Sequence, residues 1–289
     1  MGGDRGGRAR RGEAHRALLS RVLLWLALWL GLASPVAAQE MEERADLARL
    51  FDEAGTSGTI LIHAHAADRF FVADKSRADK PYSPSSTFKI PNTLLALRLG
   101  VVTGMDETFA PPAQPFLVRG KPFLPAACAG RVTLSVALQM SCIPVYQDIA
   151  GRIGVARYND FLVRMNYAPP KVTDQNLRDF WLTGAIVLSA RDQVAFLDRM
   201  IAGRLPFQAA HIDQMWAALA AGEGERGQLF AKTGYVFTSV PEVGWYVGWV
   251  RRNGEATASF ALNLDITAPE HARARREIAL RALRMLDLW

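Results

Sequence analysis

The two ends of this 289-residue chain have the sequence pattern of β-strands, and the stretch between them has that of helices. Residues 58–78 hold two short runs rich in β-branched and aromatic residues with Asp68 between them, which predicts a hairpin. Strand-like runs return only in residues 228–266, where turn residues separate them. From Ser86 to about Gly203, apolar residues recur mainly at helical spacing. A sheet built from both ends of the chain, with a helical lobe inserted between its strands, is the simplest architecture that fits this order.

Two further helices are expected at the ends of this domain. Residues 41–55 have apolar residues at helical spacing and stop at Gly55, where a left-handed cap costs little, and residues 269–289 have the pattern of a C-terminal helix. We therefore expect an α/β (α+β) fold in which an antiparallel sheet is flanked by terminal helices. The expected single domain, residues 39–289, consists of a sheet lobe (39–85 and 204–289) and an all-helical lobe (86–203).

The first 38 residues have the composition of a secretory signal peptide. Six arginines up to Arg21 lead into the apolar run "VLLWLALWLGLA", which is too short, at roughly 12 residues, for a bilayer-spanning helix of about 20. Val36 and Ala38 are small residues at the −3 and −1 positions of a cut between Ala38 and Gln39. We therefore expect secretion to the periplasm, with the signal peptide cleaved near Ala38-Gln39 and no membrane segment in the mature chain.

The formal charge of +6 gives little reason to expect a nucleic-acid partner. The predicted signal peptide holds six basic and two acidic residues, so it accounts for +4 of that charge and leaves the mature chain at about +2. No basic stripe interleaved with aromatic residues occurs elsewhere in the sequence. We therefore expect no binding of nucleic acid.

Ser86 and Lys89 form an S-x-x-K pair in the segment "SPSSTFKIPNTLLALRLG", residues 83–100. Residues i and i+3 of a helix share a face, so the hydroxyl and the amine would lie within mutual reach, as a serine nucleophile needs from its base. A helix N-terminus also leaves backbone N–H groups free to stabilise an oxyanion. The same residues fit an ordinary capped helix, because serine is a favoured N-cap. Pro91, inside the proposed helix, predicts a tight or bent first turn.

A lysine base raises a chemical problem, because its usual pKa of about 10.4 leaves almost no free amine at neutral pH. Either burial lowers the pKa of Lys89 or the amine is chemically converted. Two further motifs follow in order: Ser141 in "SCI", and Lys232-Thr233-Gly234 at the end of a predicted strand. Such a strand end can present an ammonium and a hydroxyl to a cleft, and its glycine lets a ligand approach the backbone. The ordered triple favours a catalytic site far more than any one motif does.

Together these motifs resemble those of the class D (oxacillinase-type) serine β-lactamases, and the resemblance covers nearly the whole mature chain. Four further segments match in the family's order: "DFWL" (179–182), "LSARDQVAFL" (188–197), "PEVGWYVGWV" (241–250) and "FALNLDI" (260–266). The resemblance implies the fold shared by serine β-lactamases and penicillin-binding-protein transpeptidases, and hydrolysis of β-lactam antibiotics.

The resemblance implies that Ser86 is the acylated nucleophile and that Lys89 is N-carboxylated (N6-carboxylysine) by CO2 in an apolar pocket. A lysine carbamate is an anionic oxygen base, which resolves the pKa problem. Trp181 matches the tryptophan whose indole N–H donates to the carbamate. Ile143 takes the position of the family's usual valine and Leu182 that of a family leucine, and we expect both to contact substrate.

Ser141 and Lys232 resemble the proton-relay pair that serves the lactam nitrogen. The oxyanion hole would consist of the backbone N–H groups of Ser86 and Tyr235.

Thr233 and Arg275 resemble the residues that bind the substrate carboxylate, with Gly234 beside them in the same substrate-binding stretch. Arg275 is placed by counting from "NLDI", and a slip of one residue would select Arg276 instead.

Two features of the chain leave alternatives open. Where the family has Tyr-Gly-Asn, this chain has Tyr167-Ala168-Pro169, so the asparagine amide is lost and we expect an altered substrate preference or activity at this edge of the pocket. Cys128 and Cys142 fit one disulfide and two buried free thiols equally well, and a disulfide would tether the segment around Ser141.

Two other patterns carry less weight. "GEGERG" (222–227) matches G-x-G-x-x-G, but it lies after a helix and before a strand, the reverse of the dinucleotide-binding order, and we interpret it as a loop. His63 and His65 share one face of a strand, which is compatible with a metal, but the sequence indicates no third ligand. We therefore expect exposed strand histidines and no metal site.

The sequence thus predicts a β-lactam hydrolase that needs no cofactor except CO2 or bicarbonate to carboxylate its lysine. Its expected partner is a small-molecule β-lactam, and both a monomer and a homodimer fit the sequence. Two other functions are a β-lactam sensor domain and a DD-peptidase-like protein, each of which acylates without efficient turnover. Ile143 disfavours the sensor, because sensors of this fold carry a polar residue there.

Overall fold

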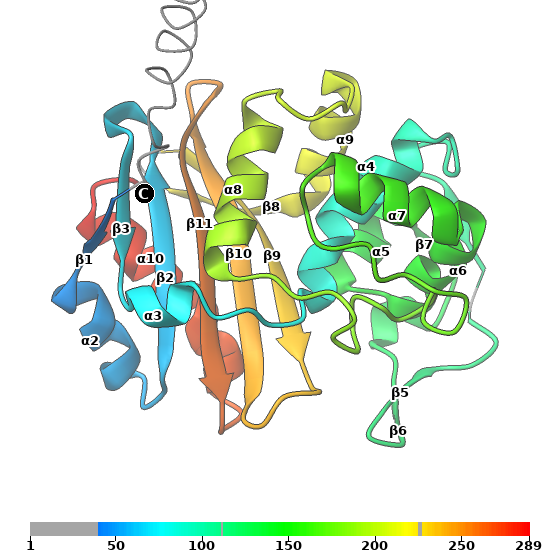
Figure 1. Ribbon diagram of the computed structural model, residues 1–289, viewed down its shortest axis with the longest axis horizontal. Helices are drawn as coiled ribbons and strands as arrows, with labels where there is room; N and C mark the ends of the chain where they lie inside the picture. Colours follow the sequence, from blue (N-terminus) through cyan, green and yellow to red (C-terminus); the bar gives the residue numbers. More distant parts are fainter. Residues whose placement is uncertain (1–39, 111, 225–226) are drawn as a thin grey trace, which may run out of the picture. The chain divides into compact units, whose positions relative to one another are not determined.

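A mixed β-sheet is the centre of the fold within Met41–Trp289 (Figure 1). The computed structural model describes residues 40–110, 112–224 and 227–289, so the predicted signal peptide and its cleavage site lie outside the described residues. The seven strands have the order β1-β3-β2-β11-β10-β9-β8. Their bounds are β1 Met41–Glu43, β2 Gly58–Ala64, β3 Arg69–Val72, β8 Ala220–Gly224, β9 Gly227–Val236, β10 Glu242–Arg252 and β11 Glu255–Ile266. As predicted, both ends of the chain build this sheet.

One edge of the sheet differs from the prediction. All neighbouring strands are antiparallel except β1, which pairs in parallel with β3. Residues 41–43 therefore form a strand rather than the start of a helix, because Met41 is buried beside Phe70 while the next two side chains are exposed. The predicted helix begins later, as α2 (Ala45–Glu53), and Gly55 has the left-handed conformation expected after it (φ +68°).

Each face of the sheet buries a separate hydrophobic core. Successive side chains of a strand point to opposite faces. Phe260 and Leu264 of β11 pack toward α2 and the C-terminal helix α10 (His271–Met285), whereas Trp245 of β10 packs on the opposite face, in the core that contains the helical lobe. The terminal helices thus flank the sheet as predicted.

The middle of the chain supplies the helices of the second core. They are α4 Lys89–Arg98, α5 Leu134–Met140, α6 Ile143–Ile153, α7 Val155–Arg164, α8 Ala190–Ile201 and α9 Ala209–Leu219, and the short α3 (Lys75–Ala78) precedes them. Helix α8 lies across the sheet against β11 and β2, whereas α9, which follows residue 203, packs against α4 and α5 (Figure 1). No helix in the described part of the chain is both long and apolar enough to cross a bilayer.

The helical lobe is not all-helical, which corrects the prediction. It contains two small ribbons, β4 (Thr108–Phe109) with β7 (Val132–Thr133), and β5 (Phe116–Val118) with β6 (Lys121–Phe123). The β5–β6 hairpin turns at Arg119 and Gly120, which have φ values of +50° and +75°. Positive φ at both central residues is typical of the two-residue turns that match the twist of a hairpin.

Candidate active site

The S-x-x-K pair lies at the junction of a 3₁₀ turn and a helix. Ser86 is in the turn η2 (Ser85–Phe88) and Lys89 is the first residue of α4, with Lys89 Nζ donating a hydrogen bond to Ser86 Oγ at 3.0 Å. The tight first turn expected from Pro91 is this 3₁₀ turn. Because α4 begins at Lys89, Pro91 lies in its first turn, where a backbone N–H would have no helical partner.

Lys89 is fully buried, with none of its surface exposed. Burial, with a contribution from the nearby Lys232 ammonium, holds the pKa of Lys89 well below its usual value. Its Nζ also lies 5.0 Å from the ring centroid of Tyr146. Burial therefore favours the neutral amine, which is the form that a base or a nucleophile needs.

A hydrogen bond joins Lys232 to Ser141, which lines the same pocket as Ser86. Lys232 Nζ, from β9, donates to Ser141 Oγ at 2.6 Å and to the Thr233 carbonyl oxygen at 3.1 Å. Ser141 ends α5 in the left-handed conformation (φ +60°). Burial lowers the pKa of Lys232 to about 7, and Arg275 adds to the shift. A proton can therefore leave or join this pair near neutral pH.

Gly234 allows β9 to pass close to the catalytic turn. A Cβ at this position would lie 3.1 Å from Pro84 O, from Thr87 Cγ2 and from Trp245 Cβ. These atoms are a backbone oxygen, a threonine methyl group and a Cβ, and none of them is the far end of a flexible side chain. The glycine of the Lys-Thr-Gly motif therefore sets the distance between β9 and Ser86.

A pocket of about 470 Å³ brings most of the predicted residues together. Eight of the eleven predicted site residues line it: Ser86, Ser141, Ile143, Leu182, Thr233, Gly234, Tyr235 and Arg275. The other three, Lys89, Lys232 and Trp181, are buried. The resemblance therefore selected residues that are far apart in sequence and adjacent in space.

Arg275 lines the pocket, and Arg276 is not among the residues that line it. Arg275 Nη1 donates to the carbonyl oxygen of Gly234 at 2.6 Å, and the side chain lines the pocket, whereas Arg276 donates to Ala221 O outside it. Gly244 makes room for this arrangement, because a Cβ there would lie 2.6 Å from Arg275 Cδ. Burial lowers the pKa of Arg275, but an arginine remains a cation and can bind a carboxylate.

Sequence reasoning missed one wall of the pocket. Glu242 accepts a hydrogen bond from the Tyr235 hydroxyl and forms an ion pair with Arg119 at 2.7 Å. Burial and this carboxylate raise the pKa of Tyr235 to about 12. Apolar side chains complete the wall: Val118, Phe123, Met140 and Phe237. Val118 and Phe123 come from the β5–β6 hairpin, whose strands are too short to give a periodic signal.

Trp181 and Tyr167 are both in the core. The carbonyl oxygen of Trp181 accepts from Ser85 N at 2.9 Å and from Ser83 Oγ at 2.7 Å, which ties it to the catalytic turn. Tyr167 packs on Phe88 rather than lining the pocket, and burial raises the pKa of its hydroxyl.

A disulfide joins Cys128 and Cys142, the residue between Ser141 and Ile143. It links the turn η3 (Ala126–Cys128) to the start of α6, 14 residues further along the chain. Of the two alternatives that the sequence left open, a disulfide or two free thiols, the structure therefore has the disulfide. It also fixes the backbone on which Ser141 sits.

Removing this disulfide is expected to destabilise the protein. Closing a loop of this length is worth about 3 kcal/mol, so Cys128→Ala/Cys142→Ala should lower Tm by about 6–12 °C. Calorimetry without reductant measures the change. Reductant should lower the Tm of the wild type and leave that of the double variant unchanged; a double variant as stable as the wild type would contradict the prediction.

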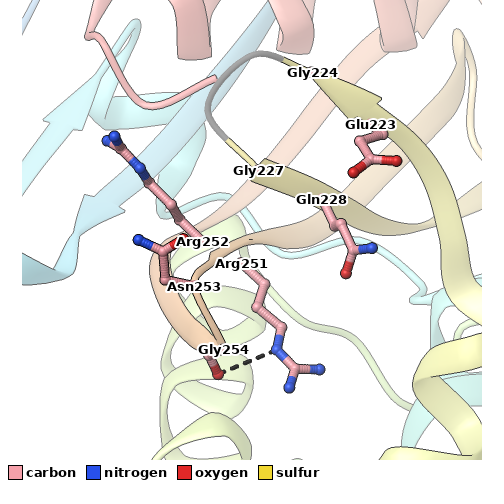
Figure 2. Close-up of a pocket in the computed structure, with 8 residues that line it drawn as sticks. All are labelled: Glu223, Gly224, Gly227, Gln228, Arg251, Arg252, Asn253 and Gly254. Atoms are coloured by element: carbon pink, nitrogen blue, oxygen red, sulfur yellow. Dashed lines mark hydrogen bonds between the residues drawn. The ribbon is translucent and has the colours of Figure 1, made fainter.

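Another hollow lies at the far end of β9, where the described residues that line it include Glu223, Gln228 and Arg251 (Figure 2). Figure 2 shows Arg251 donating from Nε to the Gly254 carbonyl oxygen, at 3.1 Å, in the turn between β10 and β11. The described residues of "GEGERG" belong to β8 and β9. Strands therefore flank this motif, which corrects its interpretation as a loop and excludes the strand-to-helix context of a dinucleotide site.

Comparisons with known proteins agree with this geometry. Residues 54–284 match the family model described as penicillin binding protein transpeptidase domain. The chain is 30% identical to β-lactamase OXA-48 of Klebsiella pneumoniae, over 91% of this chain and 97% of the relative. It is also 30% identical to β-lactamase OXA-10 of Pseudomonas aeruginosa, over 86% of this chain and 91% of that relative.

Among solved structures, the class D β-lactamase YbXI from Nostoc has a TM-score of 0.77 at 28% identity, over 84% of this chain and 99% of that one. FUS-1 (OXA-85), a class D β-lactamase from Fusobacterium nucleatum, also has a TM-score of 0.77. Its identity to this chain is 27%, over 86% of this chain and 99% of that one.

Proposed function

Because this chain belongs to the class D β-lactamases, we propose that it is a periplasmic enzyme that hydrolyses β-lactam antibiotics through a Ser86 acyl-enzyme. The observation that carries this proposal is the hydrogen bond of 3.0 Å between Ser86 Oγ and the fully buried Lys89 Nζ. Nucleophile and base are within reach of one another, in a pocket that also holds an arginine for a substrate carboxylate.

We propose further that Lys89 works as its N-carboxylated form. Its neutral Nζ would attack the carbon of CO2, form an N–C bond and lose one proton. Two observations support this step: the depressed pKa of Lys89, and the buried Nε1 of Trp181, which has no hydrogen-bond partner among the described residues. A buried N–H without a partner is costly, and a carbamate oxygen would satisfy it.

In acylation, Lys89 in this form takes the proton of Ser86, whose oxygen attacks the lactam carbonyl carbon. The backbone N–H groups of Ser86 and Tyr235 stabilise the oxyanion. As the C–N bond breaks, Lys232 passes a proton through Ser141 to the lactam nitrogen. The proton taken from Ser86 then leaves Lys89 for solvent, and Lys232 takes one up from solvent. In deacylation, Lys89 takes a proton from water, whose oxygen attacks the acyl carbon, and gives that proton to Ser86 Oγ as the ester C–O bond breaks.

Steady-state kinetics tests this proposal. The mature protein, mixed with a chromogenic cephalosporin, is expected to show many turnovers per enzyme, and more with added bicarbonate. Ser86→Ala is the matched control and should give neither a burst nor turnover. A burst of one equivalent without turnover would instead support a sensor or a DD-peptidase-like protein and would overturn the hydrolase.

The proposed relay predicts a pH dependence. The donor is the protonated form of Lys232, so activity is present below its pKa of about 7 and is lost as the pH rises through that value. Free-enzyme ionisations govern kcat/KM, which should fall above about pH 7. A bound substrate carboxylate raises the pKa of Lys232, so the fall in kcat should come at higher pH.

Lys232→Arg is the matched variant for this profile. Because an arginine does not deprotonate in this range, its residual kcat/KM should not fall near pH 7. A wild-type kcat/KM that stays level between about pH 6 and 9 would contradict the assignment of the donor.

A further inference from the structure

Three potential metal ligands converge on the sheet face under α8. His63 is the penultimate residue of β2, His65 begins the turn η1 (His65–Ala67), and Asp198 comes from α8. One ligand atom from each lies within 4.8 Å of the others. Their side chains are 13%, 20% and 14% exposed, so the histidines are not the exposed pair that the sequence predicts. Asp198 is the third ligand that sequence reasoning missed, 133 residues beyond His65.

Every ring nitrogen of the two histidines faces an acceptor. His63 Nδ1 lies 2.9 Å from Asp198 Oδ2, and His65 Nε2 lies 3.1 Å from Asp198 Oδ1. On their far sides, His63 Nε2 lies 3.0 Å from Asp68 Oδ1, and His65 Nδ1 lies 3.1 Å from the carbonyl oxygen of Ala256. A neutral imidazole has one N–H, so two rings can donate only two of these four hydrogen bonds.

Both sides of each ring offer an acceptor for its one proton. Carbonyl and carboxylate oxygens can only accept, so in neutral rings each nitrogen that faces Asp198 competes with the outer nitrogen of the same ring for one proton. If the outer nitrogens carry the protons, the lone pairs of His63 Nδ1 and His65 Nε2 face the Asp198 carboxylate, and a cation among the three groups would be bound by all of them. Hydrogen bonds from the outer nitrogens of histidine ligands to carboxylates and carbonyls are typical of metal sites.

We propose that His63, His65 and Asp198 bind one divalent transition-metal ion of the class that zinc represents. Two imidazole nitrogens and a carboxylate oxygen are ligands that Zn²⁺ accepts, and water can take the fourth position. Supporting contacts fix two of the ligands. The His63 ring stacks on Phe70 with centroids 4.0 Å apart, and Ser259 Oγ donates to Asp198 Oδ1.

The position of the cluster assigns the ion a structural role. It would join α8 to β2 at one end of the helix. Nearer the start of α8, Gln193 Nε2 donates to Thr87 Oγ1 at 2.8 Å, and Thr87 follows the nucleophile Ser86. An ion at Asp198 therefore holds a helix that also supports the catalytic turn, without touching the reacting atoms.

Metal binding to the mature protein tests this site directly. After removal of metals with EDTA, titration with Zn²⁺ is expected to show one equivalent bound per chain with a Kd of about 1 µM or lower. At a hundred-fold excess over Kd, Tm should rise by about 5–10 °C. Co²⁺ should give a visible absorption band that Zn²⁺ abolishes.

Matched variants separate this site from adventitious binding. Asp198→Asn keeps the shape of the side chain and should weaken Zn²⁺ binding by a factor of about 100 or more. Asp160→Asn makes the same change at an exposed position on α7 and should bind like the wild type. His65→Gln is the second ligand variant, for use if Asp198→Asn does not fold. Absence of saturable binding by the wild type, or binding that the ligand variants leave unchanged, would overturn the site and leave the cluster as a hydrogen-bonded group of two imidazoles and one carboxylate.

Discussion

Replacing Lys89 with alanine is expected to abolish steady-state β-lactam hydrolysis, with kcat falling by a factor of at least about 1,000. A positioned general base contributes about 10²–10⁴-fold to a proton transfer, and the proposed mechanism uses Lys89 in both acylation and deacylation. Ser86 keeps its oxyanion donors, so a slowly formed acyl-enzyme should accumulate. Intact-protein mass spectrometry after mixing with a penicillin measures that species, and a chromogenic substrate measures turnover.

Lys89→Met separates loss of the base from loss of structure. Methionine fills most of the volume of the lysine stem and removes a buried amine whose desolvation disfavours its charged form. We therefore expect a Tm equal to or above that of the wild type, with the same loss of turnover. Lys80→Ala changes an exposed lysine and should leave both quantities unchanged. Undiminished steady-state hydrolysis by Lys89→Ala would refute the assigned base.

The sequence was sufficient for those features that are local in the chain. Ser86 and Lys89 are three residues apart, so helical geometry alone predicts their contact, and the hydrogen bond of 3.0 Å confirms it. The strands of β9, β10 and β11 carry enough apolar periodicity to be predicted individually. The resemblance then supplied the contact between Ser141 and Lys232, which no local pattern could give.

Features that depend on contacts between distant segments could not be predicted. Arg119 of the helical lobe forms an ion pair with Glu242 of the sheet lobe. Charged residues far apart in sequence are usually expected on the surface, so the sequence does not show that these two meet at the pocket. The same is true of Asp198, because its distance from His65 is set by how α8 crosses the sheet. The sequence pattern predicts a helix at Met41, because periodicity within one segment cannot show that an edge of the sheet is free to pair with it.

Replacing Trp181 with phenylalanine is expected to make activity strongly dependent on added bicarbonate. The indole N–H of Trp181 has no partner among the described residues, and in the proposed enzyme it donates to the Lys89 carbamate. A hydrogen bond to a charged group is worth about 1.5–3 kcal/mol, so its loss should weaken carboxylation by a factor of about 10–150. Activity without added bicarbonate should fall accordingly, and high bicarbonate should restore most of it. The measurement is kcat as a function of bicarbonate concentration for the wild type and the variant.

Trp249→Phe is the matched control for this experiment. Trp249 is as fully buried as Trp181, and its indole N–H also lacks a partner in the described part of the chain, but it packs in the sheet core against Phe230. Both substitutions leave a similar void and should cost similar stability. Only Trp181→Phe should shift the bicarbonate dependence, because only its N–H is assigned to the carbamate. If kcat depends on bicarbonate concentration in the same way for the wild type and Trp181→Phe, carboxylation of Lys89 does not depend on this indole. If Trp249→Phe also needs more bicarbonate than the wild type, the cause is a general loosening of the core.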